Sequence, residues 1–208
     1  MNPLVLLPFL ALFALPHPHV PKAIHMHGAT GKVATVIWFT VPHNPEQVKK
    51  LPNGGSWHLG FAVLDVKSEL RCGDTAIPKA RYKLDTRRDD SGEFSTLELV
   101  PFELWQAQRG RGGKEAVAAR VEQVTKELAA EHIPTSVSLP AAKFDDGNAE
   151  HLEFMVMNRG FQAAKRGSDE PAGGAAFTLM ATFGDLHRKI DLLEVHAGAD
   201  GEDGTKDK

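Results

Sequence analysis

The sequence contains a single cysteine, Cys72, and the absence of a second thiol excludes an internal disulfide. Stability in an oxidising compartment would therefore come from ordinary core packing, with Cys72 as a small buried side chain. Basic residues are not in excess either: 24 Lys and Arg against 27 Asp and Glu give a formal net charge of -3. A phosphate-rich polymer would meet no general attraction, so the composition argues against nucleic acid as a partner.

The chain also lacks a long apolar run. The longest is the twelve-residue segment Leu4–Leu15, which contains Pro8, whereas a membrane-spanning helix needs about 20 apolar residues. This pattern predicts a signal peptide over residues 1–16, and hence export to the periplasm or the extracellular space with no stable membrane span after cleavage. Cys72 lies far downstream of this run, so an acylated cysteine at its end is excluded.

Signatures of catalysis are missing as well. The sequence has no G-x-S-x-G elbow, no H-E-x-x-H pair, no glycine-rich phosphate loop and no cysteine in a nucleophile motif. We therefore expect a non-catalytic binding or structural module of the cell envelope, with an unknown small molecule or envelope component as its partner. The alternative is a carbohydrate-active or hydrolytic enzyme whose paired carboxylates come from distant strands.

Alternation of apolar and polar residues dominates what is present. It predicts an inner strand over Lys32–Val41 and a second strand from Ser56 to Val66, in which Trp57, Leu59, Phe61 and Val63 share one face. Prolines and the NGG at residues 53–55 predict an irregular loop between them. Further strands are predicted over residues 80–87, 94–102, 135–139, 151–157, 177–183 and 186–195.

One helix stands out. The stretch Lys114–Glu131 places Val117, Val121, Val124 and Leu128 at helical spacing, so its apolar stripe should pack on a sheet. The predicted fold is mainly β: an antiparallel β-sandwich or half-open barrel with this one inserted helix. The predicted organisation is a signal peptide over 1–16, a His- and Pro-rich linker over 17–30, a single domain over 31–196 with a mobile loop at 163–174, and a disordered tail over 197–208.

Histidines near the amino terminus form the only cluster of metal-ligating residues. His17, His19, His25 and His27 lie close to Met26, and imidazole with thioether is a ligand set suited to copper. The spacing matches no closed zinc pattern, so the favoured interpretation is a linker with solvated histidines and no cofactor. Periplasmic copper binding through these four histidines remains the alternative.

Three further features have a functional and a structural interpretation. Trp57 and His58, at the start of a strand, are candidate ligand-binding residues, although a lone histidine beside small residues is more often hydrogen-bonded structure. The basic residues Arg81, Lys83 and Arg87 lie on the polar face of one predicted strand. The functional interpretation is an anion-binding strip, and the structural interpretation, which we expect, is a solvated strand face. The acidic residues at 89–90 fit turn chemistry better than a calcium loop.

Four segments together resemble a known family. GKVATVIWFTVP, SWHLGFAVLD, GDTAIPKARYKLD and AAFTLMATFGDLHRKIDL, in this order, are similar to the bacterial exported proteins classed as domain of unknown function 2911. The similarity covers most of residues 31–195. Phe183, Gly184 and Asp185 stand where a tryptophan-glycine-aspartate turn is usual in that family. The resemblance implies a shared fold more than a shared function.

Three polar positions of the family pattern differ in this chain. Val41 and His58 occupy positions where the family has arginine, and Ala62 stands in place of an asparagine. If those polar groups bind a ligand in the family, this chain has lost that activity or recognises something less charged. If they only satisfy one another, the fold persists without them.

Overall fold

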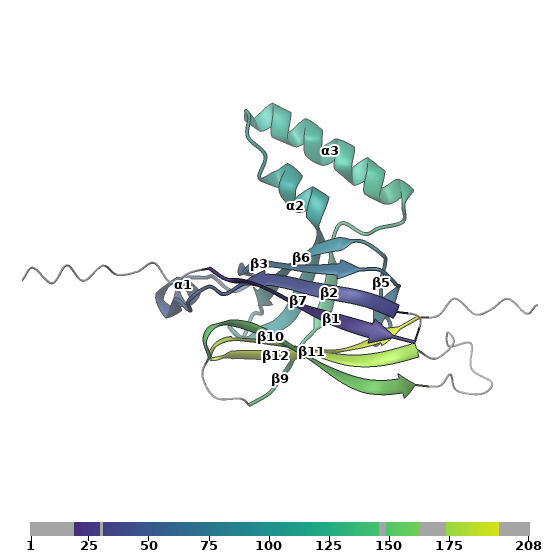
Figure 1. Cartoon of the computed structure of the whole chain (residues 1–208). Helices are drawn as coiled ribbons and strands as arrows, with labels where there is room; N and C mark the ends of the chain where they lie inside the picture. The colour runs from purple at the N-terminus through teal and green to yellow at the C-terminus, as the bar shows by residue number, and fades with distance from the viewer. Residues whose placement is uncertain (1–18, 30, 146–148, 163–173, 196–208) are drawn as a thin grey trace, which may run out of the picture.

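Two antiparallel β-sheets pack face to face in the computed structural model, which describes residues 19–29, 31–145, 149–162 and 174–195 (Figure 1). The first sheet has the strand order β1-β2-β3-β6-β7-β8: β1 (Pro21–Gly28), β2 (Gly31–Phe39), β3 (Ser56–Val66), β6 (Arg81–Arg88), β7 (Phe94–Pro101) and β8 (Val137–Pro140). The second has the order β10-β11-β12-β4-β5, with β9 paired to β12: β10 (Ala149–Gln162), β11 (Gly174–Gly184), β12 (Leu186–Glu194), β4 (Leu70–Cys72), β5 (Thr75–Ile77) and β9 (Ala142–Lys143). The predicted mainly β fold is confirmed, as a sandwich with no closed barrel.

The core lies between the sheets and draws on both. Trp38 of β2 is 3% exposed; its ring meets Phe154 of β10 edge-on at 5.4 Å, and its indole Nε1 donates to the Leu152 carbonyl oxygen at 3.2 Å. This hydrogen bond satisfies a polar atom that burial would otherwise leave unpaired. All eight predicted strands are present with ends shifted by up to five residues, as β2, β3, β6, β7, β8, β10, β11 and β12.

The alternation predicted for β3 is interrupted in the middle of the strand. The pairing of β3 with β6 shifts register between His58 and Val63, and Gly60 has a φ of +51°, a conformation that glycine adopts readily. Before this bulge the buried residue is the odd-numbered Leu59. After the bulge the even-numbered residues Ala62, Leu64 and Val66 are buried. Phe61, predicted to share a face with Trp57, is 59% exposed instead.

The predicted linker over 17–30 is wrong for residues 21–28. These residues form β1, which pairs antiparallel with β2 and closes one edge of the first sheet. Met26 is completely buried in the core. The proline and histidine content suggested a solvated segment, but a strand at a sheet edge tolerates Pro21 at its first position, and alternate residues still reach the core.

In the described residues the predicted helix is present, and two short helices that were not predicted accompany it. The loop after β2 contains α1 (Pro45–Lys49), where the Asn44 side chain accepts a hydrogen bond from the Gln47 amide at 3.3 Å. After β7 comes α2 (Phe102–Gln108), and α3 (Lys114–Ala130) matches the predicted helix. Its expected packing on a sheet is not observed, because α3 packs mainly on α2 and buries only Leu128 fully.

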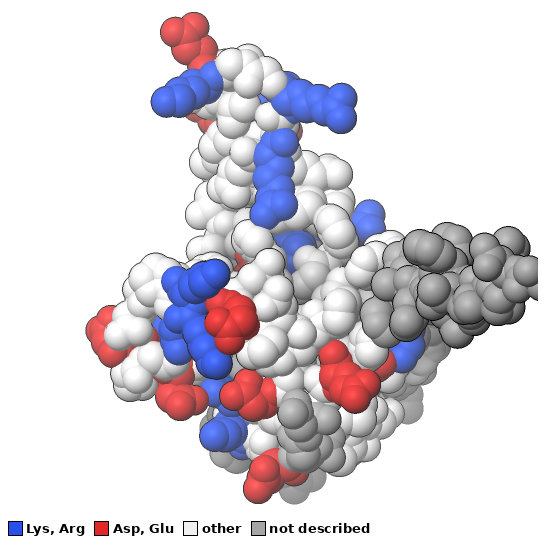
Figure 2. Space-filling view, turned by 90° about the vertical axis from the view of Figure 1, so that its left-hand side faces the viewer, with Lys and Arg blue, Asp and Glu red and all other residues white. Residues whose placement is uncertain are grey.

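The α2–α3 pair forms an arm that projects from the sandwich (Figure 1), and Figure 2 shows basic side chains on its visible face. No helix among the described residues is both long and apolar enough to cross a membrane. The predicted signal peptide over 1–16, nearly all of the loop at 163–174 and the tail at 197–208 lie outside the described residues.

Candidate functional site

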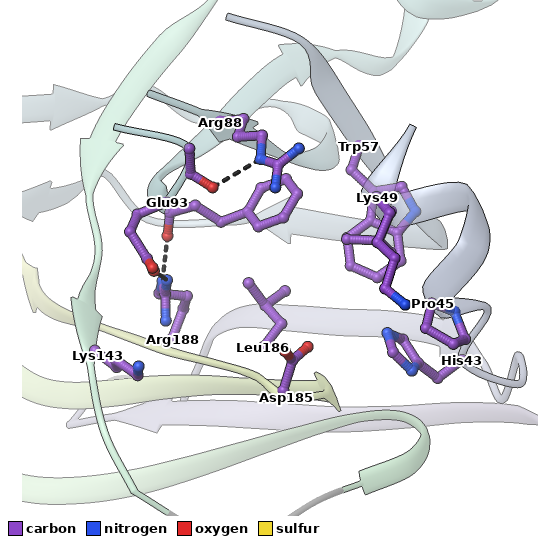
Figure 3. A pocket seen from close by; sticks show the side chains of 13 residues that line it. His43, Pro45, Lys49, Trp57, Arg88, Glu93, Lys143, Asp185, Leu186 and Arg188 are labelled. Atoms are coloured by element: carbon purple, nitrogen blue, oxygen red, sulfur yellow. Dashed lines mark hydrogen bonds and ion pairs between the residues drawn. The ribbon is translucent and has the colours of Figure 1, made fainter. Parts of the chain in front are cut away.

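A pocket of about 450 Å³ lies at the end of the sandwich where α1 is attached; we call it the end pocket. Segments far apart in the sequence meet there: the α1 loop, the start of β3, the β6–β7 turn, β9 and the β11–β12 turn (Figure 3). Its lining consists of His43, Pro45, Val48, Lys49, Trp57, Arg88, Gly92, Glu93, Phe94, Lys143, Asp185, Leu186 and Arg188. The volume is in the range of small-molecule sites, about 300–1,000 Å³.

Aromatic rings build the apolar wall of the end pocket. The Trp57 indole stacks on Phe183 with ring centroids 4.7 Å apart and planes inclined by 16°. The ring centroid of Phe94 lies 5.7 Å from that of Trp57, and the ring centroid of His43 lies 5.2 Å from that of Phe183. Because these rings come from four separate segments, their mutual packing fixes the shape of this end of the molecule.

The His43 ring lies directly on the β11–β12 turn. Gly184 in that turn has a φ of +65°, and a Cβ atom built on it would lie 2.2–2.4 Å from three atoms of the His43 ring. Only glycine allows this approach. The Nε2 atom of His43 is buried and has no hydrogen-bond partner among the described residues.

Two arginines are held rigidly in the pocket wall. Arg88 donates from Nε to the Gly92 carbonyl and from Nη1 to the Leu51 carbonyl, both at 2.7 Å, and its guanidinium lies over Phe94. Arg188, 8% exposed, donates to the carbonyls of Phe94 and His187 and pairs with Glu93 at 3.1 Å. Fixed guanidinium groups of this kind present positive charge at little entropic cost.

Two lysines add charge that is less constrained. Lys49, in the last turn of α1, has only an exposed ion pair with Glu46 at 3.3 Å. Lys143 of β9 lies opposite Arg188 of β12 and makes no ion pair within the described chain. The lining therefore has four Lys and Arg against two acids, a net charge of +2, and Glu93 is already neutralised by Arg188. Asp185 is the remaining carboxylate; it is exposed.

Of the two predicted ligand-binding residues, only Trp57 lines the end pocket. His58, the next residue of β3, lies on the opposite face of the sheet, where its Nδ1 lies 2.8 Å from Oδ2 of Asp85. Adjacent residues of a strand face opposite sides, so the two cannot form one site. The other two positions that differ from the predicted family pattern are also outside the pocket: Ala62 is buried in the core and Val41 packs near Gly60.

Asp85 links His58 to a buried lysine. Lys83, 1% exposed, donates to Oδ1 of Asp85 at 3.1 Å and to the Leu84 carbonyl at 2.7 Å. Burial lowers the pKa of Lys83 below its usual value, and the nearby carboxylate of Asp85 opposes this shift. The expectation that Arg81, Lys83 and Arg87 form a solvated face is therefore wrong for Lys83. Helix α2, which was not predicted, lies against β6, the strand that carries Lys83.

Of the histidines of the copper hypothesis, only two come together among the described residues: the ring centroids of His25 and His27 lie 6.1 Å apart. His19 bonds to the Thr40 carbonyl at one end of β1, whereas His25 bonds to Thr35 about six residues, or roughly 20 Å, further along. Met26 points into the core, away from His25 and His27. No group of three or more potential ligands is placed to hold a metal in the described residues. His17 lies outside them.

Most residues of the end pocket were missed by sequence analysis. The four cations converge only through the fold: Lys49, Arg88 and Lys143 belong to no motif, and Arg188 lies in the last segment of the family resemblance without being singled out. The local signals were Trp57, named as a candidate, and the Gly184–Asp185 turn, which was recognised as a turn and not as a site. Comparison with protein-family models, curated proteins and solved structures gives no significant match. The resemblance to domain of unknown function 2911 therefore stays a prediction.

Proposed function

We propose that this protein is a non-catalytic binding module whose ligand is a small organic anion held in the end pocket. The observation that supports the proposal most strongly is the convergence of Lys49, Arg88, Lys143 and Arg188 on one aromatic-walled cavity. Apolar walls with a few fixed polar groups are typical of ligand sites. Here those polar groups are mainly cationic, so the ligand carries a carboxylate or phosphate beside an apolar body.

The second part of the proposal concerns the compartment in which this protein works. The apolar run Leu4–Leu15 supports export, so the ligand would be an anion of the periplasm or the cell exterior. Fractionation of the native host followed by mass spectrometry tests this part. We expect a mature chain that has lost about the first 16 residues, in line with a signal peptide of 15–30 residues. An intact chain in the cytoplasmic fraction would contradict it.

Binding is tested with hexanoate and its neutral isostere hexanamide, by NMR chemical-shift titration of the purified protein. We expect hexanoate to bind more tightly and to shift the Trp57 indole resonance. The substitution Lys143→Gln should weaken hexanoate binding about two- to fivefold, as loss of one partly exposed charge contact does. Lys126→Gln is the matched control, because Lys126 lies on the arm and pairs with Glu122.

Two results would overturn the proposal. Equal affinity for hexanoate and hexanamide would mean that the positive lining does not select anions. An equal loss in the Lys143→Gln and Lys126→Gln variants would mean that binding reflects the overall charge of the protein and not the end pocket.

A further inference from the structure

The two lysines of the end pocket lie at its two sides. Figure 3 shows Lys143 on one side and Lys49 on the other, with Leu186 between them. We infer that the ligand is a dianion with one anionic group at each end. This inference rests on the proposed function, and it goes further by specifying the number and placement of the ligand charges.

On the first side, Lys143 is positioned by β-sheet pairing. Its backbone pairs with Arg188, so both side chains leave the same face of the sheet. The Arg188 guanidinium is occupied by Glu93 and two backbone carbonyls. Lys143 has no acidic partner within the described chain, and its ammonium group is free to receive an anion there.

On the other side, Lys49 belongs to the last turn of α1. Its ion pair with Glu46 joins side chains that are 72% and 70% exposed, and such pairs contribute little free energy. A ligand anion can therefore replace Glu46 or share the ammonium group with it. His43, whose Nε2 lacks a partner in the described residues, lies on the same side of the pocket in Figure 3.

Between the lysines the wall includes three apolar side chains. Leu186 is 4% exposed and Phe94 is 7% exposed, and Trp57 completes this stretch. A charge in the middle of the ligand would meet these side chains and the carboxylate of Asp185. Charge at the two ends instead meets an ammonium group on each side, whereas a monoanion can use only one side at a time.

The test compares adipate, a six-carbon dicarboxylate, with hexanoate by calorimetric titration of the full mature chain. We expect adipate to bind about five- to tenfold more tightly, which is the gain from one additional charge-assisted contact. Lys49→Gln and Lys143→Gln should each reduce adipate affinity to the level of hexanoate. Lys126→Gln should leave it unchanged. Succinate and suberate, which are shorter and longer dicarboxylates, report the spacing between the two anion positions.

The outcomes separate this inference from the proposed function. If hexanoate binds as tightly as every dicarboxylate, the two-anion inference is wrong and the anion pocket stands. If either single variant leaves adipate affinity unchanged, that lysine does not hold an anion and the inference is also wrong. If no carboxylate binds better than hexanamide, the proposed function fails together with the inference.

Discussion

At the scale of single residues, Gly184 determines whether His43 can form the wall of the end pocket. Gly184→Ala places a Cβ within 2.4 Å of the His43 ring and forces a positive φ on alanine. We expect a loss of about 3 kcal/mol in the free energy of unfolding, from backbone strain and overpacking together. Urea denaturation followed by tryptophan fluorescence measures the loss.

Gly73→Ala is the matched control for this substitution. Gly73 has a similar φ of +57°, but nothing lies within 4 Å of a Cβ at this position. Its loss should be confined to backbone strain, about 1–2 kcal/mol. Equal losses for the two variants would show that the added Cβ at residue 184 has no steric cost against the His43 ring.

Asp89, in the turn beside the end pocket, makes stability depend on acid pH. The Ser91 hydroxyl and then Ser95 hold the pKa of Asp89 at about 2, below the usual 3.8. The native state therefore binds this proton less readily than the unfolded chain does. The contribution of the ionised carboxylate is complete above pH 3.8 and is lost as the pH falls towards 2.

Unfolding free energies of the wild type and Asp89→Asn, measured at a series of pH values from about 6 to about 2, test this prediction. The advantage of the wild type should be constant above the usual carboxyl pKa and shrink below it. A difference that does not change across the acid range would contradict the assigned pKa.

Individual residues also show how far the sequence analysis reached. Trp57 was named as a ligand-binding candidate at the start of a strand, and the residue lines the end pocket. His58 was named because it shares a strand face with the small residues Gly60 and Ala62, and it lies on the opposite face of the sheet from Trp57, beside Asp85. Lys143 and Lys49 have no local signal at all, since only the assembled sheets bring them to the same pocket.

At the scale of elements, the pairing of Lys83 with Asp85 makes β6 sensitive to substitution. Asp85→Ala leaves the Lys83 ammonium buried without its counterion, so we expect a loss of about 3–5 kcal/mol. Asp65→Ala on β3 removes a more exposed pair with Lys67 and should cost less than about 1 kcal/mol. Thermal or chemical denaturation of both variants provides the comparison.

A second substitution distinguishes loss of charge pairing from simple loss of packing. Lys83→Met in the Asp85→Ala background removes the uncompensated charge and should recover part of the stability. No recovery would mean that the buried ammonium is not the cause of the loss.

The elements also show why the sequence predicted some boundaries and missed others. The start of β3 and both ends of α3 were predicted closely, because apolar periodicity is a local property. The bulge at Gly60 was missed, since a glycine within an alternating run does not reveal the register shift that follows it. The packing of α3 on α2 was missed because α2 itself was not predicted. That helix continues directly from β7 and has only seven residues.

At the scale of the whole molecule, the sandwich begins earlier than the sequence predicted. Met26 is completely buried, and β1 pairs with β2 over its whole length. Removal of residues 1–30 should therefore cost at least about 3 kcal/mol, because it deletes a core side chain and exposes a sheet edge. The reference is a chain that begins at His19 and retains β1. Hydrogen exchange of β2 amides and urea denaturation report the effect, and equal stability of the two chains would restore the interpretation of residues 21–28 as a linker.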